Sequence, residues 1–428
     1  MSERFEFRDP IHGFIEVLPH ERRIIDTPEF QRLRRIRQVG LTSYVYHGAE
    51  HSRFGHALGV MHLAGEACRV ICEKNRKLIG DTLGWNDSNG EVELQKLVYT
   101  ARLAGLLHDI GHAPFSHTGE KELFRQGLSH EDYTVRLISA GRIKEIIDES
   151  AAKTGVTSED VKSVLDRRGL HPAQFVRELI SSPWDVDKMD YLLRDSHYCG
   201  VEYGWYDLRH LIGCLTLEEG TEPKLAIDEA GIHVLEALIV ARYFMFAQVY
   251  FHDVRRAYDL VLTEFIKELL AEEYGQPVYP SPDDITAYLK WDDARVLAAA
   301  VQRAEPNTED WSWCLASRSH PKAVCWTPPS PSPIMSRRVE ELLVAVQQEF
   351  PGMKFWLDKA TDHPERYKRV DICVKMESGE QKSFAKASDL LSGLQEIGQM
   401  RIYANVRGNV PLEEKITDYC NDRLRGIS

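Results

Sequence analysis

Apolar residues recur at helical spacing along the first two thirds of the chain. This pattern predicts one helix from Phe54 to Cys72, another from about Glu93 to Asp109, and a long apolar helical region from Ile232 to about Leu270. The second of these must end near His112, because Pro114 disfavours helical geometry at the preceding residue and lacks a backbone donor. The predicted fold is therefore mainly α.

Capping residues mark two further helix starts. Thr27, followed by Pro28 and Glu29, predicts a helix that ends at Gly40. Its basic side chains are expected to form a solvated face rather than a ligand or subunit contact; they are Arg32, Arg34, Arg35 and Arg37. The segment Ser182 to Asp185 resembles a capping box with proline at the first helical position, so Asp187 should lie in the first turns of the next helix.

The pattern changes after about Gly275. A Pro-rich stretch over residues 326–333 predicts an extended loop. Beyond it, strands are expected at Lys354–Leu357, Val370–Val374 and Arg401–Val406, with a helix around Ala387–Leu394. This predicts a helical domain over residues 1–275 and a smaller C-terminal α+β subdomain over residues 276–428.

Composition excludes several classes of protein. The 428 residues are 43% hydrophobic and carry a formal net charge of -13, which argues against wrapping nucleic acid over a wide surface. A nucleic-acid partner remains allowed through a local basic pocket but is not favoured. The eight cysteines form no Cys-x-x-Cys pair, which indicates a reducing, cytoplasmic location. The apolar segment Tyr243 to Phe251 is far shorter than the ~20 residues of a membrane span, so no membrane association is expected.

Histidines are concentrated in one part of the chain. Eight of the 17 lie between His47 and His130. His108 and Asp109 are adjacent at a predicted helix end, and the same region holds His51, His56, His112, His117 and His130. Scattered core or surface histidines would not cluster in this way. The grouping of imidazoles and carboxylates indicates a metal-centred hydrolase.

The predicted metal ligands are His56, His108, Asp109 and Asp187. Two neutral imidazoles and two carboxylates suit a divalent metal such as Mn, Fe, Zn or Ni, and Mg less well. Adjacent residues at a helix end can splay toward one ion, so His108 and Asp109 can both contribute. An octahedral ion would keep two positions for water and a phosphate oxygen, which favours hydrolysis of a phosphoester or phosphoanhydride.

Five segments carry a family resemblance. They are DPIHG at residues 9–13, IIDTPEFQRLR at 24–34, GAEHSRFGH at 48–56, LHDIGHAPFSH at 107–117 and DVDKMDY at 185–191. Together they resemble the HD-domain phosphohydrolases. The similarity spans roughly residues 7–260 and is greatest to the deoxynucleoside triphosphate triphosphohydrolases of the SAM-and-HD-domain type, without the SAM domain.

The resemblance implies roles for individual residues. It assigns the metal to the same four ligands. His117 would position the nucleophile or protonate the leaving group, oriented by Glu131 with His130 beside them, since imidazole titrates near neutral pH. His112 would join these catalytic residues and, with Arg53 and Lys188, hold phosphate oxygens.

The resemblance also implies contacts to the sugar of a nucleotide substrate. Gln38, Tyr191 and Asp195 would hydrogen-bond the 3′-hydroxyl, while Val39 and Tyr258 would exclude a 2′-hydroxyl. The chain departs from the family pattern at one segment. In the family an arginine and a histidine come before the sequence Arg-Arg-Ala-Tyr. Here Tyr250 and Val254 stand before Arg255 to Tyr258. The departure removes a γ-phosphate contact, which predicts weaker triphosphate selectivity or a different substrate.

Three functional hypotheses follow. The first is a metal-dependent enzyme that hydrolyses deoxynucleoside triphosphates (dNTPs) to deoxynucleoside and inorganic triphosphate. The second is an HD-type nuclease or phosphodiesterase acting on single-stranded nucleic acid, cyclic nucleotides or nucleoside monophosphates. The third is a non-catalytic nucleotide-sensing module. Helical HD domains bury their apolar faces poorly when alone, so a homo-oligomer, a dimer or tetramer, is expected.

Overall fold

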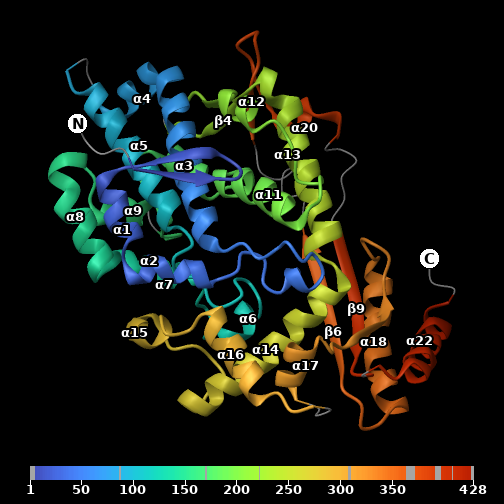
Figure 1. Ribbon diagram of the computed structural model, residues 1–428. Coiled ribbons are helices and arrows are strands. Elements are labelled where there is room, and N and C mark those ends of the chain that lie inside the picture. The colour runs from blue at the N-terminus through green and yellow to red at the C-terminus, as the bar shows by residue number, and fades with distance from the viewer. Residues whose placement is uncertain are drawn as a thin grey trace.

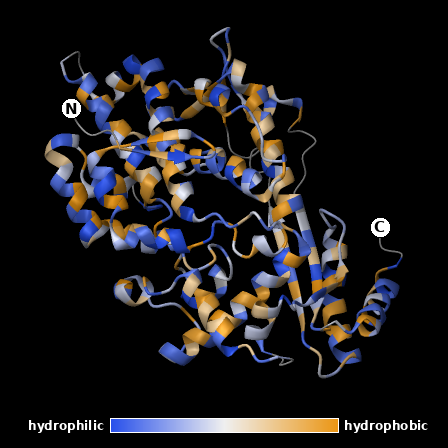
Figure 2. Cartoon of the chain, in the orientation of Figure 1, coloured by the Kyte–Doolittle hydropathy of each residue, from blue (hydrophilic) through white to orange (hydrophobic). Residues whose placement is uncertain are grey.

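The computed structural model describes residues 5–85, 88–168, 171–220, 222–306, 310–362, 372–390, 397–406 and 408–425. Helices make up most of it and the sheets are small, which confirms the mainly α prediction (Figure 1). Hydrophobic and hydrophilic residues alternate along most helices, as expected for helices with one buried face (Figure 2).

The helices of the first half are α1 (Pro19–Ile25), α2 (Pro28–Gln31), α3 (Arg53–Lys74), α4 (Arg76–Leu83), α5 (Gly90–Leu107), α6 (Glu120–Leu123), α7 (His130–Ser139), α8 (Arg142–Thr154), α9 (Ser158–Leu165), α10 (Gln174–Ile180), α11 (Val186–Cys199) and α12 (Leu208–Gly213). Those of the second half are α13 (Ile232–Met245), α14 (Asp253–Tyr274), α15 (Ile285–Tyr288), α16 (Asp293–Arg303), α17 (Trp311–Ser317), α18 (Pro333–Glu349), α20 (Phe384–Ala387) and α22 (Val410–Leu424). Short 3-10 turns are η1 (Arg32–Arg35), η2 (Thr42–Tyr44), η3 (Glu229–Gly231) and η5 (Pro282–Asp284), and η4 (Phe246–Tyr250) is a π-helix.

Helices α3 and α5 pack against each other at the centre of the first core. They match the predicted helices closely at both ends. Their close approach depends on glycine. A Cβ on Gly105 would lie 2.8 Å from the carbonyl oxygen of Val60, and one on Gly65 would lie 2.7 Å from Cγ of Arg102. This packing sets the end of α5 beside the start of α3.

The segment predicted as one helix from Thr27 to Gly40 is broken. Thr27 does cap α2, but helical geometry ends at Arg35 and Ile36 is extended. The turn directs Arg32 inward, where it is 1% exposed and donates to the carbonyl oxygens of Trp291 and His112. The expectation of a solvated basic face is therefore wrong for Arg32, because those buried carbonyls need a donor.

The apolar region from Ile232 to Leu270 is two helices rather than one. Helix α13 passes into the π-helix η4, and α14 starts after a break at His252, which caps it through Nδ1. One continuous helical stretch in the described chain, Glu229–Tyr250, is long and apolar enough to cross a membrane by length and composition alone. The apolar stretch is thus longer than Tyr243 to Phe251. Such helices also occur in the cores of soluble proteins, so this observation is weak support for a membrane span.

The strands form three small sheets. They are β1 (Phe5–Asp9), β2 (Gly13–Val17), β3 (Leu215–Leu217), β4 (Leu225–Asp228), β5 (Lys322–Trp326), β6 (Phe355–Asp362), β7 (Cys373–Lys375), β8 (Gln381–Ser383) and β9 (Ile397–Ala404). Strands β1 and β2 make an antiparallel hairpin that packs against α3, shown in dark blue in Figure 1. The second sheet has the order β3-β4-β7-β8, with β4 and β7 parallel.

The third sheet is antiparallel with the order β5-β9-β6, and α18 and α22 pack on it with their own hydrophobic core (Figure 1). Two predicted strands correspond to β6 and β9. Of the strand predicted at Val370–Val374, residues 370 and 371 lie outside the described residues, and β7 begins at Cys373. Of the helix predicted around Ala387–Leu394, residues 391–394 lie outside them and α20 ends at Ala387.

Residue 275 does not separate the hydrophobic cores. A second core cluster joins residues of α14 to residues of α16 and α17. In addition, β7 pairs with β4, so a strand from the last sixty residues completes a sheet begun near residue 215. The division into residues 1–275 and 276–428 stays a prediction.

Candidate metal centre

The start of α3 brings one predicted ligand to the centre of the molecule. His56 lies in the first turn and is fully buried. Helices α3 and α11 come unusually close here. A Cβ on Gly59 of α3 would lie 1.9 Å from Oδ1 of Asp190 on α11. Glycine at position 59 is therefore required by the contact between α3 and α11.

The end of α5 supplies the adjacent pair. Helix α5 stops at Leu107, so His108 and Asp109 lie at the turn that follows. The carbonyl of Leu107 accepts from the backbone N–H of Ile110 at 3.2 Å, and that of Asp109 accepts from His112 at 3.1 Å. These tight turns let both side chains point toward His56, as the sequence predicted for a helix end.

Helix α11 supplies Asp187. Its cap is Asp185, whose carboxylate accepts from the backbone N–H of Lys188 at 2.9 Å. The predicted start at Ser182 and Pro183 is therefore three residues too early, because the carboxylate of Asp185 competes successfully for the helix end. Asp187 still lies in the first turn, as predicted.

The four predicted ligands converge. Nε2 of His56 lies 3.0 Å from Oδ1 of Asp187 and 3.5 Å from Oδ2 of Asp109. Nε2 of His108 lies 3.3 Å from Oδ1 of Asp109 and 3.7 Å from Oδ1 of Asp187. Metal bonds of about 2.1 Å place neighbouring ligand atoms about 3.0 to 3.4 Å apart. Ligand atoms of His56, His108 and Asp187 therefore lie close enough together to hold one ion, and Asp109 lies beside them within 3.5 Å of both histidines.

Hydrogen bonding orients both imidazoles toward the same point. Nδ1 of His56 donates to Oδ2 of Asp190 at 2.7 Å, and Nδ1 of His108 donates to the carbonyl oxygen of Gly105 at 2.8 Å. The Nε2 atoms then carry lone pairs that face carboxylates, and neither has a hydrogen-bond partner among the described residues. A cation between these groups would satisfy all of them, so the residues fit a divalent metal.

The charges in this centre are strongly coupled. Burial lowers the pKa of His56, but the nearby carboxylates of Asp187 and Asp190 outweigh it and raise the pKa to about 9. Burial raises the pKa of Asp109, but Arg53 and His108 outweigh it and hold the pKa well below its ordinary value. The carboxylates are therefore ionised, and in the metal-free protein a proton takes the place of part of the cation's charge.

Arg53 lies beside the centre. It is buried, forms an ion pair with Oδ2 of Asp109, and donates from Nε to Ser116 Oγ at 2.7 Å. Ser116 and Phe115 both have positive φ, near 60°, in the turn that follows Pro114. This turn places Ser116 where it can hold the Arg53 guanidinium against the predicted ligand.

A second histidine cluster, formed by His112, His117, His130 and Glu120, adjoins the metal centre. Glu120 lies at its middle, since its two oxygens accept from Nδ1 of His130 at 2.9 Å and Nδ1 of His117 at 3.0 Å. His112 stacks on His130 with ring centroids 3.8 Å apart. Nε2 of His112 lies 3.2 Å from Oδ1 of Asp109, which joins the two clusters.

The prediction that Glu131 orients His117 is wrong for this structure. Glu131 forms an ion pair with Arg167 instead. Glu120 takes the predicted role because the left-handed turn at Gly119 brings it back toward His117, three residues earlier. The signal available in the sequence was an acid three residues after His117, close to the motif itself.

Electrostatics fix the protonation states of Glu120 and His112 in the second cluster. Burial raises the pKa of Glu120, but His117 and hydrogen bonds from the three histidines lower it far below its ordinary value. Burial and the nearby Arg53 lower the pKa of His112 to about 3. Glu120 is thus a permanent anion and His112 a neutral imidazole at physiological pH.

Two family models match the chain. The HD domain matches residues 53–195 and the HD associated region matches residues 206–406. A solved structure of a hypothetical protein from Aquifex aeolicus is 30% identical in sequence with a TM-score of 0.76, covering 97% of this chain and 99% of that chain. The chain belongs to the HD-domain phosphohydrolase family.

Other relatives include proteins with stated activities. A phosphohydrolase from Bacteroides thetaiotaomicron has a TM-score of 0.72 at 26% identity, covering 94% of this chain and 99% of that one. An uncharacterised Bacillus subtilis protein is 37% identical over 64% of this chain and 58% of its own length. The deoxynucleoside triphosphate triphosphohydrolase SAMHD1 of Gallus gallus is 32% identical over 60% of this chain and 44% of its own length. The chain therefore matches about half the length of these curated relatives.

Hydrogen bonds connect Gln38 and Asp195, two of the predicted sugar-contact residues of this HD-domain protein, through His51. Asp195 accepts from His51 Nε2 at 2.7 Å and from the hydroxyl of Tyr250 at 2.6 Å. The carbonyl of His51 accepts from the backbone N–H of Gln38 at 3.1 Å. One turn before Asp195 on α11, the hydroxyl of Tyr191 accepts from Arg242 of α13 at 3.1 Å. His51 and Tyr250 therefore contact a predicted sugar-contact residue without having been predicted themselves.

The two residues predicted to exclude a 2′-hydroxyl lie in different hydrophobic clusters. Val39 belongs to the first core and Tyr258 to the second, where it packs edge-on against Tyr44 at 4.7 Å. The Tyr258 hydroxyl and Oε1 of Gln38 are buried, and neither has a hydrogen-bond partner among the described residues. Lys188 donates to Asp185 at 2.8 Å.

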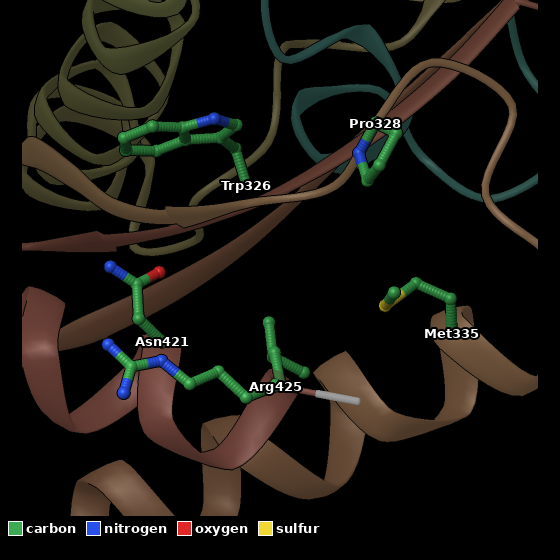
Figure 3. Close-up of a pocket in the computed structure, with 6 residues that line it drawn as sticks. Trp326, Pro328, Met335, Asn421 and Arg425 are labelled. Carbon is green, nitrogen blue, oxygen red and sulfur yellow. The ribbon is translucent and has the colours of Figure 1, made fainter. Parts of the chain in front are cut away.

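A pocket in the described chain lies away from the metal centre. It measures about 390 Å³ and is lined by Trp326, Pro328, Met335, Asn421, Leu424 and Arg425. Figure 3 shows Trp326 and Pro328 on one side of it, with Met335, Asn421 and Arg425 opposite. It shares no residue with the metal centre.

Proposed function

We propose that this protein is a metal-dependent hydrolase that converts deoxynucleoside triphosphates to deoxynucleoside and inorganic triphosphate. The observation that carries the proposal is the pair of unpartnered Nε2 atoms of His56 and His108, which face the carboxylates of Asp109 and Asp187. The name of the SAMHD1 relatives supports the choice of substrate.

The proposed ligands are His56, His108, Asp109 and Asp187. A bound Mn, Fe, Zn or Ni ion, or with less preference Mg, would supply a Lewis acid that activates water and offsets charge on a phosphoryl group. Arg53 is fixed against Asp109 and Ser116, so its remaining N–H groups can bind a phosphate oxygen. Lys188 and neutral His112 flank the same centre and can add two more donors.

His117 is the proposed proton donor. Its side chain is 63% exposed, and its Nδ1 is held by Glu120. That bond leaves Nε2 to face the substrate, with Glu120 holding the ring in place and His130 beside it. In the reaction a water oxygen bonds to the α-phosphorus and the bond from phosphorus to O5′ breaks. O5′ takes the proton of His117, and a proton of the water restores it through solvent.

Two buried polar atoms support a nucleotide sugar as the group recognised. Oε1 of Gln38 and the Tyr258 hydroxyl are buried without a partner among the described residues, a costly arrangement that a bound polar ligand would relieve. Val39 and Tyr258 supply the bulk that would disfavour a 2′-hydroxyl. Asp195 and Tyr191 complete the proposed contacts.

A second candidate is an HD-type phosphodiesterase or nuclease that acts on substrates with fewer phosphates. The observation that favours it is the hydrogen bond from Tyr250 to Asp195, where Tyr250 stands in place of a family arginine. A tyrosine has no charge to bind a γ-phosphate. Nucleoside monophosphates, cyclic nucleotides and short single strands are therefore the competing substrates, whereas a non-catalytic sensor would turn over none of them.

The test is product analysis with purified protein and Mn²⁺. Each dNTP, NTP and dNMP, a cyclic nucleotide and a short single strand are incubated separately and resolved by chromatography. Deoxynucleoside with triphosphate, from dNTPs alone, is the expected result. Monophosphate or strand cleavage without dNTP turnover would favour the second candidate, and binding without turnover the sensor.

We also propose that the protein is cytoplasmic and forms a dimer or tetramer. The exposed aromatic side chains of Tyr203, Trp205 and Phe244, at 43%, 54% and 42% exposure, are the apolar surface that supports assembly. Light scattering at micromolar concentration tests the oligomer. A monomer across that range would contradict it.

A further inference from the structure

Asp190 lies at the centre of a buried polar network behind the proposed ligand His56. Its Oδ2 accepts from Nδ1 of His56 at 2.7 Å and from Nε of Arg194 at 2.8 Å. Its Oδ1 contacts Nε2 of His12 at 2.6 Å and accepts from Nη2 of Arg194 at 2.9 Å. Both carboxylate oxygens are therefore fully engaged, which fixes the plane of the carboxylate.

The N-terminal hairpin closes this network from the other side. Asp9, the last residue of β1, accepts from Nη1 of Arg194 at 2.9 Å. Its Oδ1 also accepts from the backbone N–H groups of Ile11 at 2.9 Å and His12 at 3.0 Å, so the same carboxylate shapes the turn that presents His12. The conspicuous DPIHG segment of the sequence thus contacts the second layer around the metal centre, and the mechanism proposed above leaves it without a role.

The network is sealed from solvent. The side chains of Asp190, His12, Arg194 and Asp9 are 0%, 3%, 2% and 7% exposed. Gly59 permits the close approach, because a Cβ there would lie 1.9 Å from Oδ1 of Asp190 and 2.6 Å from Nη2 of Arg194. A set of charges this deeply buried is expensive unless every group is paired, and here Arg194 bridges both carboxylates.

We propose that Asp190 is a positioning residue for the metal centre, and that the N-terminal hairpin acts through it to set metal affinity. The inference rests on the metal centre proposed above. By accepting the Nδ1 proton of His56, Asp190 selects the tautomer that leaves Nε2 as a ligand atom and raises its basicity. His12 and Arg194 hold Asp190 in place, so undocking the hairpin would release one edge of the carboxylate and let the His56 ring turn.

The effect on metal binding should decrease with distance from His56. Asp190→Asn keeps the volume and one acceptor but loses the charge, and should weaken metal binding about 10- to 100-fold, the range found for partners that hold ligand histidines. His12→Ala keeps the pair between Asp190 and Arg194 and should weaken it less. His12→Asn, which can still hydrogen-bond Asp190, should recover part of that loss.

The chain offers a matched control in a second buried ion pair. Glu21 is fully buried and accepts from Nε and Nη2 of Arg102 at 2.6 and 2.7 Å. The pair braces the same N-terminal region but contacts none of the proposed ligands. Glu21→Gln should therefore lower thermal stability comparably and leave metal affinity at the parent value.

The experiment uses the full-length chain, stripped of metal with a chelator and titrated with Mn²⁺ and Co²⁺ against a competing chelating dye. The Co²⁺ absorption spectrum reports coordination geometry, and circular dichroism reports folding. The expected result is weaker binding and an altered spectrum in Asp190→Asn, a smaller loss in His12→Ala, and neither in Glu21→Gln. If Asp190→Asn does not fold, the metal affinities of His12→Ala and His12→Asn test the inference instead.

Two outcomes would overturn the inference. One is parent-like affinity in folded Asp190→Asn, or in His12→Ala where the first variant does not fold. The other is an equal loss in Glu21→Gln, which would mean that general destabilisation weakens the site. A parent protein that binds neither metal would instead refute the proposed metal centre, so the two failures are distinguishable.

Discussion

Two neighbouring histidine clusters in this molecule differ in the direction of their ring hydrogen bonds. In the metal centre the imidazoles donate Nδ1 to groups outside, namely Asp190 and Gly105, so their lone pairs face inward toward carboxylates. In the second cluster the imidazoles of His117 and His130 donate Nδ1 inward to Glu120. The first arrangement leaves two Nε2 atoms facing carboxylates, whereas the second directs two ring N–H groups to one carboxylate. Both groups have side chains close enough together to hold a metal ion, so the direction of the ring hydrogen bonds is what distinguishes them.

The largest effect should come from breaking the first cluster. Asp187→Ala removes a proposed ligand, the carboxylate that lies near Nε2 of both His56 and His108. We expect loss of bound metal by elemental analysis and a fall in turnover of about 10⁴-fold or more, since the metal supplies most of the chemistry. Asp207→Ala, another acid at a helix start, should keep both. Full metal content in Asp187→Ala would exclude Asp187 as a ligand.

A smaller effect is expected from the second cluster. Glu120→Gln weakens the hydrogen bond that holds His117 in place and should lower turnover about 10²- to 10³-fold, the size of a general acid contribution. Because Glu120 contacts none of the four proposed ligands, metal content should stay at the parent level. A parallel loss of metal and activity would show that the two clusters act as one functional unit.

Metal affinity should depend on pH. Burial lowers the pKa of His56, but Asp187 and Asp190 raise it to about 9, so below that pH a proton must leave before a cation binds. Because the folded value is raised, this proton stabilises the metal-free protein below pH 6.5, and that contribution is lost as the pH rises toward 9. Burial also lowers the pKa of His108, but Asp109 and Asp187 outweigh it and raise this pKa as well, so binding should tighten by at least about tenfold per pH unit between pH 6.5 and 9. Calorimetric titrations with Mn²⁺ at three pH values test this, and a flat profile would contradict it.

The smallest effect is predicted for Glu131→Gln. Glu131 pairs with Arg167, whose side chain is 71% exposed, and such surface pairs contribute little. Turnover should stay within about twofold of the parent. This variant is the matched control for Glu120→Gln, because the substitution is the same eleven positions further along the chain. A larger loss in Glu131→Gln than in Glu120→Gln would restore the role that the family resemblance gave Glu131.

Much of the helical fold was predictable from periodicity and capping. The ends of α3 and α5 agree with prediction to within about three residues, since Pro114 and the apolar pattern are local signals. The break after Arg35 and the π-helix η4 were not predicted, because burial of Arg32 and packing around Tyr250 depend on distant segments. The pairing of β7 with β4 was also inaccessible, since strand partners so far apart in sequence leave no local pattern.

The sequence by itself determined the family, the mainly helical class and the four candidate ligands. Motif spacing and the residues that end a helix are local features of the sequence. Only the tertiary structure decided which carboxylate accepts the ring hydrogen bond of which histidine. Glu120 rather than Glu131 holds His117, and Asp190, for which the sequence indicated no role, holds His56. Hydrogen-bond partners are fixed by the three-dimensional approach of helix ends and turns, and residues 134 positions apart can meet as closely as neighbours.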